Sequence, residues 1–204
     1  MLIEHGGRSP KVHESAYVAP TAVLSGDVVV GEGCSVLFGA VLTAESESRI
    51  ELQPRSLVMD NAVVRARVGF DVVIGRNSLI GPHAHVNGSE IGDNVFVATG
   101  ASIFPGARVD DRAELRVGAV LHVNSHLTEG AMVPIGWIAL GDPAEAFPPG
   151  AHKDFARIQE ELDFPGTVYM LKRAGEGESI MPKVAERYQE LFGRHRDDRI
   201  IDEG

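Results

Sequence analysis

Aliphatic residues recur every six positions along most of this chain, and this period restricts the possible folds more than any other feature of the sequence. An amphipathic α-helix would need apolar residues at spacings of three and four, and a β-meander would need longer strands with turn signals every 8–12 residues. Neither pattern fits. The period breaks after Leu42 and shortens to five before Ile91. The residues of this aliphatic register are Val12, Val18, Leu24, Val30, Val36, Leu42, Leu52, Val58, Val64, Val68, Ile74, Ile80, Val86, Ile91, Val97, Ile103, Val109, Leu115, Leu121, Leu127 and Val133.

A second register of small residues lies four positions after the first. Side chains alternate between the two faces of a strand, so a coil with three flat six-residue sides has two inward positions on each side. Those positions must fill a narrow triangular interior without voids, which favours one aliphatic and one small residue. The small residues are Ala16, Ala22, Val28, Cys34, Ala40, Ser56, Ala62, Val72, Ser78, Ala84, Val95, Ala101, Ala107, Ala113, Ala119, Ser125 and Ala131.

The two registers together predict an all-β chain wound into about seven stacked triangular coils. The pattern resembles the hexapeptide-repeat left-handed β-helix, and the left hand is implied by that resemblance alone. We assign residues 1–141 to a left-handed parallel β-helix, because the repeat ends beyond Leu140. Cys34, the single cysteine, excludes an internal disulfide and reads as a small buried hydrophobe.

Residues 142–204 are expected to form a linker and a C-terminal helical extension that packs on the β-helix. Prolines open this segment. Apolar spacing predicts one helix over about 152–162 and a second over about 181–192. Between them, 167–171 is expected to be extended. The charged end RHRDDRIIDEG, 194–204, is expected to fray.

The break in the repeat, Thr43–Glu51 (TAESESRIE), is predicted to be a loop ejected from one corner of the coil. Such loops often border functional sites. The acidic side chains of Glu45 and Glu47 are interpreted as solvated loop charges.

The charge balance argues against a nucleic-acid partner. The chain has 19 Lys and Arg against 29 Asp and Glu, which gives a formal net charge of −10. A phosphate backbone would have to find a local basic patch against this field. No apolar run approaches the roughly 18 residues that span a bilayer, and MLIEHGGRSP has no signal-peptide character. We therefore expect a cytoplasmic protein with no membrane partner.

Residues 8–145 resemble a narrower group, the γ-class carbonic anhydrase-like proteins. The segments that carry the resemblance are SAYVAPTAVLSGDVVVGEGCSVLFGAVL, SLVMDNAVV and VVIGRNSLIGPHAHVNGSEIGDNVFVATGASIFPGARV. The order of these blocks is the better evidence, with Asp60 before Val63 and Val64 and a later VNG-x-x-IG step. The resemblance implies a trimer of parallel prisms with a divalent metal held by three histidines between neighbouring subunits.

All three histidine positions implied by the resemblance hold other residues here. Arg65 follows the aliphatic pair after Asp60. Pro82 follows Gly81 of the Ile-Gly pair, and Asn87 precedes Gly88 in the VNG-x-x-IG motif. Three imidazoles let zinc lower the pKa of bound water to about 7, and the resulting hydroxide attacks CO₂. A guanidinium repels a divalent cation, so we do not expect standard carbonic anhydrase activity. Asp60 is the main polar position that matches the family pattern.

A displaced divalent metal, zinc for instance, is one alternative. His83 and His85 alternate along one strand and both face away from the inward Ala84, and His122 or His126 could supply a third ligand two coils further on. The other interpretation is that these histidines are surface or trimer-contact residues.

A pocket for a small anion or carboxylate is a further alternative. Arg65 would supply a planar fork of donors beside Asn87, with Asp60 nearby. Pairing of Arg65 with Asp60 of a neighbouring subunit would be the purely structural interpretation.

Three functions remain open. The first is a divergent γ carbonic anhydrase-like homotrimer with a relocated metal or a small-anion site at the subunit interface. The second is an acyltransferase that uses acyl-coenzyme A, with His83, His85 or His122 as general base. The third is a non-catalytic scaffold or assembly subunit. Trimerisation is expected because Phe104 and Val123 are predicted to point outward, where association would bury them.

Overall fold

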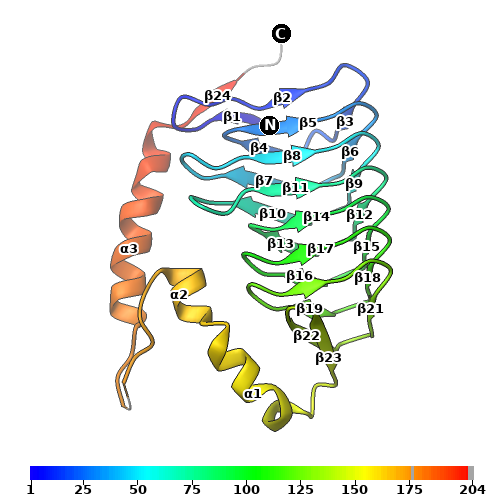
Figure 1. Cartoon of the computed structure of the whole chain (residues 1–204). Coiled ribbons are helices and arrows are strands. Elements are labelled where there is room, and N and C mark those ends of the chain that lie inside the picture. The colour runs from blue at the N-terminus through cyan, green and yellow to red at the C-terminus, as the bar shows by residue number, and fades with distance from the viewer. Residues whose placement is uncertain (176, 202–204) are drawn as a thin grey trace.

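The structure, a computed structural model, describes residues 1–175 and 177–201 and is a tall column of stacked triangular coils with helices along one side (Figure 1). Each coil contributes one strand to each of three parallel sheets, and each strand pairs with the strand three further along the chain. Seven coils are complete, and β22 begins an eighth. The prediction of a left-handed parallel β-helix of about seven coils with C-terminal helices is confirmed.

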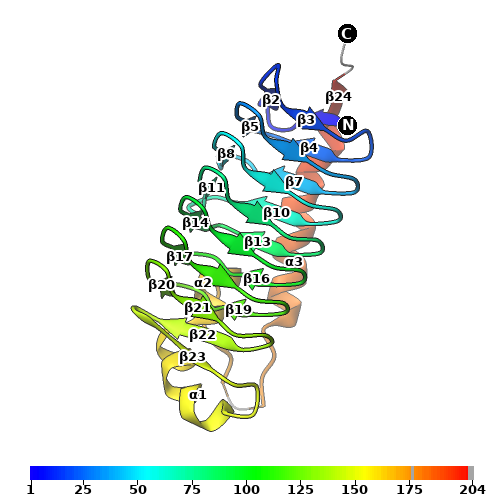
Figure 2. The same cartoon turned by 90° about the vertical axis from the view of Figure 1, so that its right-hand side faces the viewer.

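The first sheet has ten strands, and its two end strands are antiparallel to their neighbours. Figure 2 shows its strands stacked one above another. In spatial order they are β23 (Ala144–Phe147), β22 (Ile138–Gly141), β19 (Val120–Leu121), β16 (Ser102–Ile103), β13 (His85–Asn87), β10 (Val63–Ala66), β7 (Val41–Ala44), β4 (Val23–Ser25), β1 (Leu2–Glu4) and β24 (Arg199–Ile201).

The other two sheets have seven parallel strands each. The second sheet consists of β2 (Lys11–Val12), β5 (Val28–Val30), β8 (Ile50–Leu52), β11 (Val72–Ile74), β14 (Glu90–Ile91), β17 (Arg108–Val109) and β20 (His126–Leu127). The third sheet consists of β3 (Tyr17–Val18), β6 (Ser35–Val36), β9 (Leu57–Val58), β12 (Leu79–Ile80), β15 (Phe96–Val97), β18 (Glu114–Leu115) and β21 (Met132–Val133).

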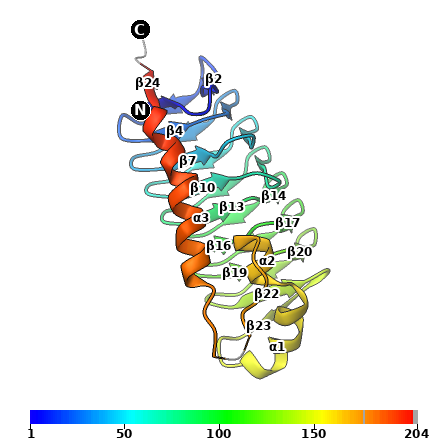
Figure 3. The same cartoon turned by 90° about the vertical axis from the view of Figure 1, so that its left-hand side faces the viewer.

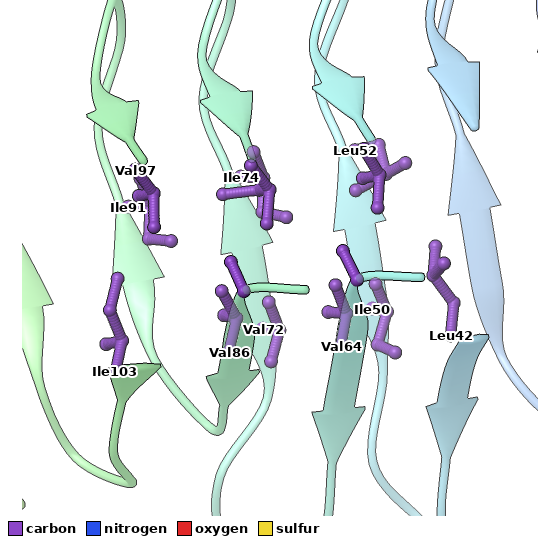
Figure 4. Close-up of a cluster of buried hydrophobic side chains, with 14 of the residues drawn as sticks. Leu42, Ile50, Leu52, Val64, Val72, Ile74, Val86, Ile91, Val97 and Ile103 are labelled. Carbon is purple, nitrogen blue, oxygen red and sulfur yellow. The ribbon is translucent and has the colours of Figure 1, made fainter. Parts of the chain in front are cut away.

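The aliphatic register forms the core of the column, with side chains from successive coils stacked on one another (Figure 4). Cys34 is buried among them, as predicted. The assignment of Val68 to this register is wrong, because its side chain is 47% exposed. The inward positions of β10 end at Ala66, and Arg67 and Phe70 form an antiparallel bridge across a tight turn outside the coil.

The C-terminal segment runs back along the first sheet. It contains α1 (His152–Glu161), α2 (Phe164–Tyr169), α3 (Met181–Gly193) and the 3₁₀ helix η1 (Arg194–Asp197). The two predicted helices correspond to α1 and α3. Figure 3 shows α3 lying over the strands of the first sheet and leading to β24 beside β1. Among the described residues, no helix is both long enough and apolar enough to cross a membrane.

Two predictions for this segment are wrong. Residues 167–171 are not extended, because Asp163 caps α2 by accepting a hydrogen bond from the Gly166 amide. Residues 194–201 do not fray, because η1 leads into β24, which pairs with β1. The remaining residues, 202–204, lie outside the described part of the chain.

The outward-facing apolar residues that were expected to drive trimerisation are covered within the chain. Val123 is completely buried, and the ring of Phe104 packs edge-on against Phe164 of α2 with 5.5 Å between centroids. The argument for a trimer from these two residues is therefore wrong, because the chain's own tail occupies the face that they would have offered.

The stacked core predicts a large penalty for a cavity at Ile74, whose side chain has no exposed surface. Ile74→Ala is expected to lower the free energy of unfolding by about 2–5 kcal/mol, since transfer and cavity terms add. Val73→Ala is the matched control, because the neighbouring side chain points out of the coil and is half-buried. Urea unfolding followed by circular dichroism measures both. Equal losses for the two variants would contradict the assignment of inward positions.

Candidate functional site

The outer face of the first sheet brings together residues that are far apart in the sequence. The strand register places Arg65 beside Thr43 on β7 and beside Asn87 on β13. Arg65 and Asn87 are two of the positions singled out from the sequence, so the register makes them neighbours. Asp60 lies at the preceding corner, where its backbone carbonyl accepts a hydrogen bond from the His83 amide at 3.0 Å.

A cavity of about 840 Å³ lies between this face and the C-terminal segment. We call it the tail cavity. Its charged lining consists of five cationic side chains and three carboxylates, so the lining carries an excess of positive charge. Sheet residues contribute one wall, and α3 and the segment after α2 contribute the other. The lining residues are Glu45, Arg65, Ala66, Arg67, Val68, His85, Asn87, Val168, Tyr169, Met170, Leu171, Lys183, Val184, Glu186, Arg187, Tyr188, Glu190, Leu191 and Arg194.

Arg67 attaches the tail to the sheet at the rim of this cavity. Its two terminal nitrogens donate to the backbone carbonyls of Thr167 and Val168, and its guanidinium lies over the Phe70 ring at 4.9 Å. Burial lowers the pKa of the Arg67 guanidinium. The buried side-chain oxygen of Asn87, by contrast, has no hydrogen-bond partner within the described chain. The cavity therefore offers both cationic donors and an unused acceptor.

Glu45 is the residue that the sequence interpretation placed wrongly. It was expected to be a solvated loop charge, but its side chain is only 3% exposed, whereas Glu47 is exposed as expected. One oxygen of Glu45 accepts a hydrogen bond from Arg65 at 2.6 Å, and the other lies 3.2 Å from the ring of His195. Within one chain, Arg65 thus pairs with Glu45 rather than with Asp60. The interrupted repeat was the signal that could have pointed to Glu45.

The histidines proposed as metal ligands lie in different surroundings. His83 is exposed in a turn with φ of 57°. His85 lines the tail cavity, and burial, followed by the charge of Arg65, lowers the pKa of its imidazole. His122 is buried beside Phe164, with ring centroids 5.7 Å apart and one ring nitrogen without a partner in the described chain.

His126 cannot join these residues within one chain, because it belongs to β20 of the second sheet. Its ring lies between Asp110 at 2.8 Å and Asp142 at 3.0 Å. Among the described residues, the one group of three histidine or carboxylate side chains close enough to share an ion is a different one, made of His5, His195 and Asp198. A site built from His83, His85 and His122 stays a prediction.

Comparisons with known proteins show which families and proteins this chain is similar to. A family model described as bacterial transferase hexapeptide (six repeats) matches residues 71–105. The chain is 29% identical over 144 residues to gamma carbonic anhydrase 2, mitochondrial, of Arabidopsis thaliana, a match that covers 68% of this chain and 49% of that protein. It is 32% identical over 108 residues to carnitine operon protein CaiE of Escherichia coli (strain K12), over 52% of this chain and 54% of that protein.

In sequence this chain is similar to γ carbonic anhydrase-like proteins over about two thirds of its length, and its family-model match is to the hexapeptide repeat. The chain spans about half the length of the curated relatives named above. Among solved structures, the acyltransferase LpxA from Bacteroides fragilis 9343 matches with a TM-score of 0.54 and 16% identity, over 95% of this chain and 98% of that one. At that identity the match shows a shared fold only.

The residues of this chain at the three family ligand positions do not fit zinc. The guanidinium of Arg65 is always cationic and already holds the Glu45 carboxylate. The side chain of Pro82 has no donor atom, and an amide such as that of Asn87 is a poor zinc ligand. No zinc-bound hydroxide is assigned to this position.

The different surroundings of the histidines predict an order of pKa values in a titration followed by NMR. The pKa of His85 and His122 should lie below 6.5, because burial disfavours the charged ring, and the pKa of His126 should lie above 6.5, because Asp110 and then Asp142 accept its protons. His126 therefore stabilises the fold at low pH, and this contribution is lost as the pH rises through its folded-state pKa. Asp110→Asn should lower the pKa of His126 alone. An unchanged value would contradict the assignment.

Proposed function

We propose that this γ carbonic anhydrase-like protein binds a small anion, a carboxylate or bicarbonate, in the tail cavity and does so without the zinc chemistry of its family. The observation that carries the proposal is the adjacency of Arg65 and Asn87 in a cavity whose charged side chains are mainly cationic. Arginine binds a carboxylate with two parallel hydrogen bonds, and such charge-assisted bonds are about twice as strong as neutral ones.

The polar groups around Arg65 favour an anion that also carries a hydrogen-bond donor. The buried oxygen of Asn87 needs a donor, and bicarbonate or a hydroxy acid has both an anionic oxygen and a hydroxyl group. A lowered pKa keeps His85 neutral near pH 7, so this ring can donate or accept a hydrogen bond without adding charge. The cavity is large enough for a ligand of several carbon atoms.

Calorimetric titration with bicarbonate, acetate and glycolate tests the proposal. Arg65→Gln should weaken binding at least about tenfold, because a hydrogen bond to a charged group contributes about 1.5–3 kcal/mol. Arg65→Lys should give an intermediate loss, since it keeps the charge beside Glu45 but not the planar fork. Arg76→Gln, at an exposed arginine, is the control. Glycolate should bind more tightly than acetate.

The same experiment separates the competing functions. Absence of binding by all three anions would overturn the proposal and leave the scaffold interpretation. Binding of acetyl-coenzyme A that is lost in His85→Gln or His122→Gln would favour the acyltransferase instead. Zinc bound in proportion to the chain and released by His83→Gln or His85→Gln would support the relocated metal site.

The homotrimer is proposed on a different surface from the one expected from sequence. The first sheet is covered by α3, and the outward row of the second sheet is mostly charged. The third sheet presents an outward row that is mostly apolar, in which Tyr17, Phe96 and Met132 are exposed. Association would remove this apolar row from water, which favours self-association through the third sheet. A cytoplasmic location stays a prediction.

Phe96→Glu should dissociate this assembly, because it places a charge in the centre of the apolar row. Sedimentation velocity at micromolar concentration should change from a trimer to a monomer. Glu90→Lys, an equally exposed change on the second sheet, should leave the trimer intact. A wild-type protein that sediments as a monomer would contradict the proposal.

A further inference from the structure

A second group of ionisable side chains lies at the N-terminal end of the column, next to the tail cavity. His5 follows β1, Glu45 follows β7, and His195 and Asp198 come from the end of the tail. These segments are up to 193 residues apart in the sequence, and the tail reaches His5 because β24 pairs with β1. Counted over whole residues, His5 and Glu45 are each only 2% exposed, so most of this group is removed from water.

The two imidazole rings are stacked between two carboxylates. Their centroids are 4.3 Å apart and their planes differ by 25°. On one side, the Nδ1 atoms of His5 and His195 lie 2.6 Å and 2.8 Å from the two oxygens of Asp198. On the other side, the Nε2 atoms lie 3.9 Å and 3.2 Å from Oε2 of Glu45.

This arrangement has more acceptors than two neutral rings can satisfy. A neutral imidazole carries one N–H, whereas His195 faces a carboxylate oxygen within hydrogen-bond distance at both of its nitrogens. Protonating both rings would supply the missing donors, but it would stack two positive charges 4.3 Å apart beside the Arg65 guanidinium. A divalent cation supplies the same two charges without that repulsion.

We propose that His5, His195 and Asp198 bind a divalent transition metal, with Nδ1 of each ring and the Asp198 carboxylate as ligands. One ligand atom from each residue lies within 4.8 Å of the others. Two imidazoles and a carboxylate suit Zn²⁺ and its neighbours in the first transition series. Bonds of 2.0–2.1 Å in a tetrahedron put ligand atoms roughly 3.3 Å apart, so Asp198 would move by about half an ångström or slightly more. The two stacked rings would also turn so that both Nδ1 atoms point at the ion.

Glu45 and Arg65 supply the outer shell of this site. A metal-bound histidine usually donates its second N–H to a carboxylate, which fixes the tautomer and the orientation of the ring. Glu45 stands at that position for His195, at 3.2 Å, and lies 3.9 Å from Nε2 of His5. Arg65 in turn holds the other oxygen of Glu45 at 2.6 Å.

The site is separate from the family ligand positions and does not depend on the anion proposed for the tail cavity. Its ligands join the first coil to the last segment of the chain, so the metal would fasten the tail along the first sheet. Metal binding requires rings with a free lone pair, so affinity should fall in acid, where protons compete with the metal.

Metal content and thermal stability test this inference on the whole chain, purified without a histidine tag. After dialysis against EDTA and then Zn²⁺, elemental analysis should find one equivalent per chain, and the melting temperature should rise with Zn²⁺. Co²⁺ in place of Zn²⁺ should give the visible absorption of a site with nitrogen and oxygen ligands. His195→Gln and Asp198→Asn should each lose the metal and the thermal shift. Glu45→Gln should weaken affinity by about 10–100-fold, as outer-shell changes do.

Two controls make the result decisive. His13→Gln, at an exposed histidine between β2 and β3, should retain the metal, and circular dichroism should show that every variant keeps its β-helix. Wild-type protein that neither retains Zn²⁺ nor gains stability from Zn²⁺, Co²⁺ or Mn²⁺ would overturn the inference. Zinc that persists in both His195→Gln and Asp198→Asn would also overturn it, because the ion would then be bound elsewhere.

Discussion

The narrow triangular interior of the coil is the constraint on which the rest of this structure depends. Each flat side has room for one aliphatic and one small inward residue, so the stack of coils leaves little freedom inside. Charged and amide side chains must therefore lie at the outward positions and at the corners. Arg65, Asn87 and Glu45 occupy such outward or corner positions, and none of them disturbs the packing of Val64, Ala66 or Val86 beneath them.

The C-terminal tail changes what the first sheet can do. An open face of parallel strands would be a surface for a neighbouring subunit, but α2 and α3 cover it and leave a cavity between them and the sheet. Arg67 and the β1–β24 pairing hold the tail in place at the two ends of this cavity. Because this face is covered, the apolar side chains of Phe104 and Val123 are removed from water within one chain.

Charge connects the two proposed sites. Arg65, Pro82 and Asn87 stand where the family resemblance implies three imidazoles, so a fixed positive charge lies where a cation would be expected. That positive charge is balanced by Glu45, and Glu45 is also the residue that faces both histidines of the proposed metal site. A single buried carboxylate thus lies between a cavity suited to anions and a cluster suited to a cation.

The sequence by itself determined the triangular coil, because a period of six with one aliphatic and one small inward residue fits the interior of stacked three-sided coils, whereas the left hand came from the family resemblance. It also determined that the three histidines implied by the family resemblance are absent, since that depends only on which residues stand at the matching motif positions. Tertiary structure decided the rest. Glu45 was predicted to be a loop charge, but it is buried, and its partners are Arg65 of β10 and His195 of η1. His5, His195 and Asp198 had no shared motif because they meet only when β24 pairs with β1. The local sequence pattern identifies the inward-facing residues of each strand, but it does not show which distant segment will cover the outward-facing residues.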